Sequence, residues 1–427
     1  MATQIDWLGS EHIDSFRSFC CSVICMSNEL HSILARFDAM GAAKSLSVLA
    51  TVIDVRGSSY RLPGARMLID GAGNTYGTVS GGCLEADLMT RAAWVRESGE
   101  SEVFVYDTSI NDDSVFGLNM GCRGVIRVLL EPADPKLFEF LRHRLSSREG
   151  GVVATLVSTA KGGSESRVGS RLLIDERGLV ASDIVAAAQA IIADDCFGAL
   201  RTKTSTLNVY EFGEVFIEYI APPVPLVVFG AGHDAAPLIR FAKELGWHVT
   251  VVDHRAASSK LAQFSVADNV IVARPQEAAG LVPIDKDTAA VLMTHNYAID
   301  LELAEFLLRS PARYVGMLGP RSRAERMLAD LSRIGVDAGA RAMKRAYAPI
   351  GIDIGAETPE EIALSIIAEI CAVLAGRGAG MLRHRAGSIH GRADESDAAG
   401  IESGAGRVDK GDAVGIESEL PDSSLRN

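Results

Sequence analysis

The stretch Leu226–Asp253, LVVFGAGHDAAPLIRFAKELGWHVTVVD, decides the fold of the second half of this chain. The apolar run LVVF leads into Gly230-Ala231-Gly232, a helical pattern follows, and a second apolar run ends at Asp253. This is a βαβ nucleotide-binding pattern, in which the glycines permit a tight turn and the approach of a phosphate to the helix N-terminus. Asp253 is placed to accept from ribose hydroxyls, which favours NAD over NADP. The stretch predicts a Rossmann fold. Its crevice either binds a nucleotide, is empty, or serves a purpose other than nucleotide binding.

Three more strands with parallel-sheet character follow, NVIVA, AAVLMT and RYVGML, and two of them lead into loops rich in functional residue types. Because ligands of such sheets bind at the carboxyl ends of the strands, the site candidates here are His295, Asn296, Arg321 and Arg323. His295 is either a general base or a hydrogen-bonded loop residue. The two arginines either bind a ligand or form the solvated first turn of a helix.

The linker APPVP at 221–225 is the clearest domain boundary. We expect an α/β protein with an N-terminal extension at 1–26 and an α+β domain at 27–221, followed by a Rossmann-like doubly wound domain at 222–380. Residues 381–427 are expected to form a disordered tail, because they are rich in small and acidic residues and repeat the sequence GIES.

A second informative stretch, Gly57–Glu85, lies in the α+β domain and ends in Ser80-Gly81-Gly82-Cys83 immediately before a predicted helix. A thiol at a helix N-terminus meets unpaired N–H groups and the positive end of the helix dipole, which favours the thiolate. Gly81 and Gly82 leave room for a ligand and supply amides that bind anions.

Two arginines precede this cysteine in the same stretch. Arg61 and Arg66 are placed to pair with a phosphate or another oxyanion. The stretch therefore predicts a soft ligand, the Cys83 sulfur, beside a phosphate cradle. The alternative is an inert buried cysteine after a tight turn.

A second cysteine lies between glycines, in Gly121-Cys122-Arg123-Gly124, immediately before the strand VIRVLLE. Like Cys83, Cys122 lies at a junction between a loop and a regular element and outside any apolar stripe. This placement favours a functional pair of cysteines, although the sequence does not establish that the two face each other.

Composition excludes several classes of protein. In the 427 residues, 48% hydrophobic and 23% charged content is typical of a soluble globular protein. The net charge of −13 argues against a nucleic-acid-binding surface, and no apolar run has the length of a membrane span. The seven scattered cysteines fit neither a disulfide framework nor a zinc finger. The first 25 residues lack the basic leader of a signal peptide, so we expect a cytoplasmic protein.

The chain resembles the XdhC/CoxI accessory proteins of molybdenum hydroxylases over roughly residues 28–380. The resemblance rests on six motifs in the same order, which are GSSYRLPGARMLI with SGGCLEADL, the GC-x-G turn before LLEP, VVFGAGHDAAPL with VTVVDHR, MTHNYAIDLELA, YVGMLGPRSR, and APIGIDIGAETPEEIALSIIAEI. One departure is Arg123, which stands where the family commonly has glycine.

The resemblance implies a chaperone of the molybdenum cofactor (molybdopterin) with no turnover of its own. Such proteins protect the cofactor, support its sulfuration by a partner cysteine desulfurase, and insert it into an apo molybdenum hydroxylase such as xanthine or carbon monoxide dehydrogenase. By position, Cys83 and Cys122 match the family's cysteines and are implied to contact the molybdenum or its dithiolene. Gly230, Gly232 and Asp253 match its Rossmann motif, where NAD(P) or another nucleotide is the expected occupant.

Two other functions stay open from the residues alone. The Rossmann motif with His295 suggests an NAD(P)-linked oxidoreductase, although no single loop supplies an evident acid–base pair. Cys83 and Cys122 suggest a thiol-based sulfur-transfer enzyme. A homodimer is also expected, without a residue-level argument for it.

Overall fold

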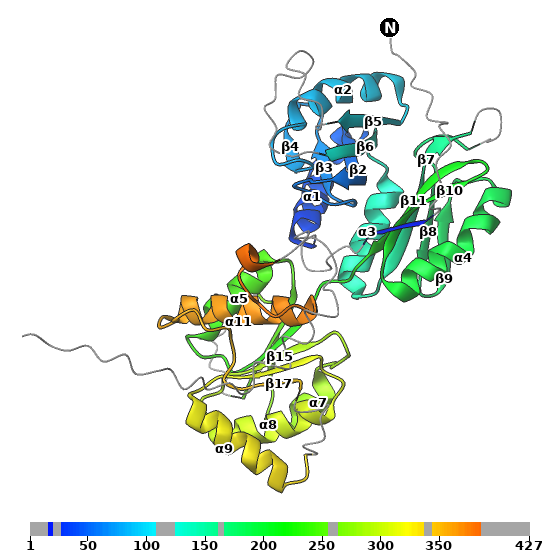
Figure 1. The fold of residues 1–427 in the computed structure, drawn as a ribbon. Coiled ribbons are helices and arrows are strands. Elements are labelled where there is room, and N and C mark those ends of the chain that lie inside the picture. The colour runs from blue at the N-terminus through cyan, green and yellow to red at the C-terminus, as the bar shows by residue number, and fades with distance from the viewer. Residues whose placement is uncertain are drawn as a thin grey trace, which may run out of the picture. The chain divides into compact units, whose positions relative to one another are not determined.

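The structure is a computed structural model, and it describes residues 16–19, 27–107, 124–160, 166–254, 264–336 and 344–385. Gly121, Cys122 and Arg123 lie outside the described residues. So does most of the expected tail. Three sheets organise the rest, two in the N-terminal half and one in the C-terminal half (Figure 1).

The first sheet has five antiparallel strands in the order β4-β3-β2-β6-β5. Its elements, with the helices around it, are α1 (Ser27–Ala39), η1 (Gly41–Leu46), β2 (Val48–Gly57), β3 (Arg66–Ile69), β4 (Thr75–Gly77), α2 (Glu85–Ser98), β5 (Glu102–Asp107) and β6 (Gly124–Pro132). Helix α2 packs on β2 and β6 through Leu84, Leu88, Ala92 and Val95, as its spacing predicts. This apolar stripe fixes the position of the α2 N-terminus, and with it the position of Cys83.

The second sheet has six antiparallel strands in the order β1-β10-β11-β7-β8-β9. Its elements are β1 (Phe16–Phe19), α3 (Pro135–Ser147), β7 (Gly151–Thr159), β8 (Arg171–Asp175), β9 (Gly178–Ser182), α4 (Ala186–Thr202), β10 (Ser205–Tyr210) and β11 (Gly213–Ile220). Apolar clusters that combine residues of both sheets, such as Leu49 with Val153 and Ile53 with Phe216, pack the two sheets together.

The third sheet is parallel, in the order β14-β13-β12-β15-β16-β17, which is the doubly wound arrangement expected for a Rossmann fold. Its elements are β12 (Pro225–Phe229), α5 (Ala235–Glu244), β13 (His248–Asp253), β14 (Asn269–Val272), α7 (Pro275–Leu281), β15 (Ala289–Leu292), α8 (Tyr297–Arg309), β16 (Tyr314–Met317), α9 (Arg321–Arg333), β17 (Ala346–Tyr347) and α11 (Pro359–Leu374). A short η3 (Leu382–His384) follows.

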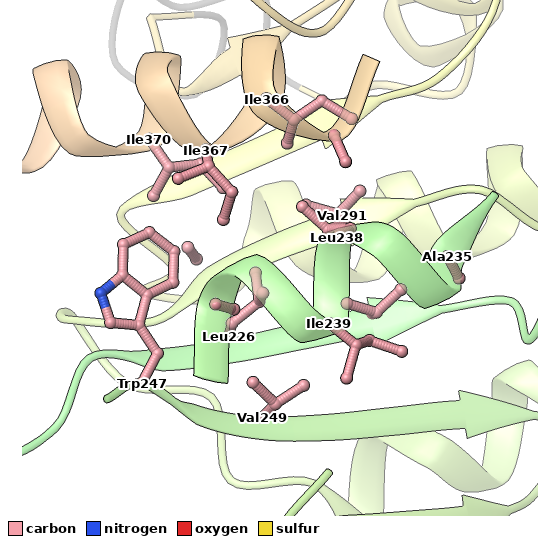
Figure 2. Close-up of a cluster of buried hydrophobic side chains, with 14 of the residues drawn as sticks. Leu226, Ala235, Leu238, Ile239, Trp247, Val249, Val291, Ile366, Ile367 and Ile370 are labelled. Atoms are coloured by element: carbon pink, nitrogen blue, oxygen red, sulfur yellow. The ribbon is translucent and has the colours of Figure 1, made fainter. Parts of the chain in front are cut away.

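Helices cover both faces of this sheet. Helices α5 and α11 lie on one face, and α7, α8 and α9 lie on the other (Figure 1). Figure 2 shows the first of these layers, where Leu238 and Ile239 of α5 face Ile366 and Ile370 of α11 and Trp247 lies at one end of the cluster. The strand order reverses between β12 and β15, so the loops after these two strands flank the crevice where ligands of such sheets bind.

Several elements were missing from the sequence-based prediction, among them β1, β9, α4, α7, α8 and β17. Strand β1 pairs antiparallel with β10, so four residues of the expected N-terminal extension are part of a sheet. Helix α4 had a detectable signal, because Ala188, Ile192, Cys196 and Ala199 recur at helical spacing and are buried.

Candidate functional site

The turn that carries Cys83 lies between β4 and α2. Gly81 and Gly82 have φ values of +80° and +117°, a backbone conformation that favours glycine at both positions. Leu84 is the N-cap of α2, and the Cys83 side chain is exposed one residue before it. The alternative of an inert buried cysteine is therefore wrong.

The carboxylate of Glu85, the first residue of α2, lies at the centre of this turn. It accepts hydrogen bonds from the backbone amides of Ser80 at 3.0 Å, Gly82 at 2.9 Å and Leu84 at 3.0 Å. It also accepts from the hydroxyls of Thr78, at 2.6 Å, and Ser80. Burial alone would raise the pKa of this carboxyl, but these hydrogen bonds outweigh burial and lower the pKa of Glu85 to about 2.

The amides of the two glycines are therefore occupied within the turn. Gly82 donates to Glu85, and the Gly81 amide donates to the Thr78 hydroxyl at 3.0 Å. A permanent negative charge also lies at the helix end, where the dipole would otherwise attract an anion. The predicted phosphate cradle at Gly81 and Gly82 is corrected accordingly, because the chain's own carboxylate occupies that role.

Arg61 also has a partner inside the protein. Its guanidinium forms a close ion pair with Glu29 of α1, and the second oxygen of Glu29 accepts from the Thr78 amide at 2.9 Å. Arg61 thus ties its loop to α1 and, through Glu29, to the start of the cysteine turn. Its charge is neutralised at close range, which argues against phosphate binding by Arg61 in this conformation.

Arg66 is even less available to bind a ligand than Arg61. Its side chain is only 6% exposed and donates to Glu218 of β11 through both terminal nitrogens, one of these hydrogen bonds measuring 2.8 Å. It also donates to the carbonyl of Gly64 at 3.0 Å. This buried pair joins the first sheet to the second, so the structure places Arg66 in the framework and away from an external anion.

The glycine-rich loop of the Rossmann domain forms the other predicted site. Gly230 has φ +110°, and a Cβ atom there would lie 2.5 Å from the carbonyl oxygen of Met293. Asp253, at the end of β13, is buried and accepts a hydrogen bond from the Ala231 amide at 2.6 Å. The acidic residue expected to contact a ribose therefore contacts the glycine-rich loop itself.

His295 lies across the crevice, in the loop after β15. It has φ +60°, and its Nε2 lies 2.9 Å from Oδ2 of Asp234 at the N-terminus of α5. A Cβ atom on Gly232 would lie 3.6 Å from the same ring nitrogen. The structure thus brings Gly232, Asp234 and His295 together at the switch point. Asn296 instead caps α8, accepting from the amides of Ala298 and Ile299.

The two arginines of the next loop differ. Arg321 is the exposed first residue of α9. Arg323 donates to the buried carboxylate of Asp300, which also accepts from the Thr294 hydroxyl at 2.6 Å. Arg323 therefore fixes the loop that carries His295, a role that Arg321 does not share. Both arginines lie in the first turn of α9, which is one of the two expectations for them.

Three residues of these sites escaped sequence reasoning as site residues. Glu85 and Asp234 were visible as acidic residues in or before a first helical turn, which is a known signal for amide capping. Tyr60 was visible only as a loop residue. Its side chain is 66% exposed, and it lies against Gly81.

Within the described ranges, no three His, Cys, Asp or Glu side chains are grouped so as to hold a metal ion. In those same ranges no helix combines the length and apolar character that a membrane crossing requires. Cys122, the second predicted metal ligand, is not among the residues described. Of the two predicted metal ligands, Cys83 is the one that lies among the described residues.

Comparisons with known proteins match both halves of the chain. Residues 226–370 match the model of the XdhC Rossmann domain, and residues 42–107 match that of the XdhC and CoxI family. The chain is 32% identical over 337 residues to a Bacillus subtilis protein named as a probable xanthine dehydrogenase subunit, covering 78% of this chain and 94% of that protein.

Two further relatives extend the comparison. The molybdenum cofactor insertion chaperone PaoD of Escherichia coli is 25% identical over 348 residues, which cover 80% of this chain and 88% of PaoD. A crystal structure described as a xanthine dehydrogenase from Bacillus halodurans superposes with a TM-score of 0.66 at 31% identity, covering 82% of this chain and 98% of that one.

Proposed function

This chain belongs to the XdhC and CoxI family, and from that membership we propose that it is an accessory protein that binds the molybdenum cofactor and passes it to a molybdenum hydroxylase. The observation that carries the proposal is the exposed Cys83 thiol on a turn held rigid by Glu85. The name of PaoD, an insertion chaperone, supports the same role.

The residues around Cys83 fit a soft metal better than an oxyanion. A cysteine sulfur is a suitable donor for molybdenum, which binds soft ligands readily. The bound cofactor would supply the molybdenum–dithiolene centre, and Cys83 would supply one sulfur contact to it. The space beside Gly82, the residue before Cys83, is open, because a side chain there would have no neighbour within 4 Å. Cys122 is kept as a second proposed contact.

Further steps belong to the same proposal. We include support of sulfuration by a partner cysteine desulfurase, delivery to an apo xanthine or carbon monoxide dehydrogenase, and assembly as a homodimer. The names of the relatives support a hydroxylase partner in general. In the Rossmann domain, the crevice at Gly230, Gly232 and Asp253 is proposed to bind a nucleotide, with His295 and Arg321 at its rim.

The deciding experiment is the molybdenum and pterin content of the protein purified from a cofactor-producing host, compared with Cys83→Ala. We expect near-stoichiometric cofactor in the wild type and its loss in the variant. Cys371→Ala, at a partly buried cysteine of α11, serves as the control and should retain the cofactor. A wild-type protein that carries no cofactor, and takes none up when it is supplied anaerobically, would exclude the proposal.

A second candidate function is an NAD(P)-linked oxidoreductase, favoured by the His295–Asp234 pair beside the glycine-rich loop. Titration with NAD⁺ and NADH, followed by assay for hydride transfer, tests it. Hydride transfer that is lost in His295→Ala but unaffected in Cys83→Ala would support this function over the cofactor carrier.

A further inference from the structure

Tyr60 lies beside the cysteine turn with most of its ring in solvent. Its side chain is 66% exposed, although an aromatic ring of this size gains free energy from burial. A Cβ atom on Gly81 would lie 2.9 Å from Cδ1 and 3.1 Å from Cε1 of the ring. The ring therefore packs against the bare backbone of Gly81, and a side chain at that position would displace it.

The surface next to this contact is open. A Cβ atom on Gly82 would meet nothing within 4 Å, and Cys83 follows as an exposed thiol. Gly81, Gly82 and Cys83 are consecutive exposed residues, and together with the Tyr60 ring that lies against Gly81 we call them the Tyr60–Cys83 surface. It combines an aromatic ring, two glycines and a sulfur atom.

Charge on this surface disfavours a phosphate. The carboxylate of Glu85 takes up the amides of Ser80, Gly82 and Leu84. The nearby Arg61 is neutralised by Glu29. In the turn itself, hydrogen-bond donors and positive charge are therefore already matched by the protein's own carboxylates.

Resting on the proposed function, we propose that the Tyr60–Cys83 surface binds the ring end of the cofactor. Tyr60 stacks on the planar pyrimidine ring of the pterin while Cys83 contacts the metal end, and the cofactor's phosphate lies away from this turn. Heteroaromatic rings stack favourably on exposed aromatic side chains. In single-stranded nucleic acid binding this stacking occurs with every base. The amides of the turn, already bonded to Glu85 and Thr78, supply no comparable attraction for phosphate.

The test measures binding of anaerobically released molybdenum cofactor to the full-length protein, with the molybdenum and pterin that stay with the protein after removal of unbound cofactor as the readout. Tyr60→Ala should weaken binding about 5- to 100-fold, the range found for loss of one aromatic stacking partner. Tyr60→Phe keeps the ring and should stay within about twofold of the wild type, because stacking needs the ring and not the hydroxyl. Trp94→Ala, an exposed aromatic further along α2, is the matched control and should bind as the wild type does.

Two competitors separate the ring from the phosphate. A phosphate-free pterin should displace the cofactor in the wild type but lose this ability in Tyr60→Ala, and inorganic phosphate in large excess should displace nothing. Equal binding by wild type and Tyr60→Ala, or displacement by inorganic phosphate, would overturn this inference and leave the carrier function intact. Failure of the wild type to bind cofactor at all would overturn both.

Discussion

At the scale of single residues, the chemistry of the Cys83 turn depends on where one carboxylate points. Glu85 accepts hydrogen bonds from four backbone amides and two hydroxyls, so a helix end that resembles an anion site already has its anion. The thiol two residues earlier is left exposed and unobstructed. We therefore expect recognition here to depend on sulfur and aromatic surface rather than on backbone N–H groups.

Replacing this carboxylate should make stability depend on pH in a defined direction. The pKa of Glu85 is lowered to about 2 in the folded chain, so the ionised form stabilises the fold above about pH 4.5, and that contribution is lost as the pH falls toward 2. We expect Glu85→Gln to unfold at a lower denaturant concentration than the wild type at pH 7. The gap between the two proteins should narrow as the pH approaches 2.

Chemical denaturation at pH 7 and at pH 3 measures that gap. Glu97→Gln, a substitution at the other end of α2, provides a reference for loss of one negative charge from the same helix. A gap between wild type and Glu85→Gln that stays constant from pH 7 to pH 3 would contradict the assigned role of this carboxylate.

At the scale of elements, the tight junction between β12 and α5 depends on Gly230. A side chain there would be strained by φ +110° and would lie 2.5 Å from the Met293 carbonyl oxygen. We expect Gly230→Ala to destabilise the protein by about 1–3 kcal/mol, as strained backbone positions do. Thermal unfolding measures the change.

Gly232→Ala is the matched comparison within the same loop. Its Cβ would clash with the Asp234 carboxylate, at 2.5 Å, which can move away, and would lie at ordinary contact distance, 3.6 Å, from the His295 ring nitrogen. We expect a smaller loss of stability, under about 1 kcal/mol, together with loss of the His295–Asp234 contact. The two variants should therefore differ, and equal destabilisation would argue against a specific strain at Gly230.

The elements themselves were largely predictable, for reasons that the sequence contains. Apolar runs ending in glycine or in polar loops marked the strands of the parallel sheet, and the capping box at Thr358 and Glu361 marked the start of α11. Helix α4 was missed because apolar side chains, Ile191 and Phe197 among them, also lie on its exposed face and obscure the helical spacing.

The site was less predictable than the fold, because its contacts are made by side chains from distant segments. Arg66 finds its partner 152 positions later, at Glu218, and Arg61 finds its partner 32 positions earlier, at Glu29. Local spacing contains no information about such pairs. From the sequence alone, an arginine near a cysteine is therefore interpreted as a phosphate ligand. Only the fold shows which carboxylate it pairs with.

At the scale of the whole molecule, the hydrophobic clusters of the described residues divide at the proline-rich linker. The clusters before it are built from residues of the first two sheets and their helices and those after it from the Rossmann domain, and the partly exposed ion pairs Arg148–Asp285 and Lys203–Asp287 cross the linker. The Arg66–Glu218 pair further joins the two N-terminal sheets into one unit. This arrangement predicts that the two halves of the chain unfold in separate transitions.

Two variants show which half of the chain unfolds in which transition. Glu218→Gln leaves the Arg66 guanidinium buried without its partner, so it should lower one transition by about 3–5 kcal/mol and spare the other. Gly230→Ala should lower the second and spare the first. Differential scanning calorimetry of both variants measures this, and a single transition that moves with either substitution would disprove the separation.

The complete set of hydrogen bonds in the Cys83 turn also affects how quickly a ligand can be exchanged. Since Glu85 and the hydroxyls of Thr78 and Ser80 hold the turn in this shape, we expect that neither arrival nor departure of a ligand requires the backbone to reorganise. The residence time of a ligand is then determined by its own contacts with sulfur and ring. A partner protein whose own atoms bind the ligand more strongly can then take it without any change in the backbone of this chain.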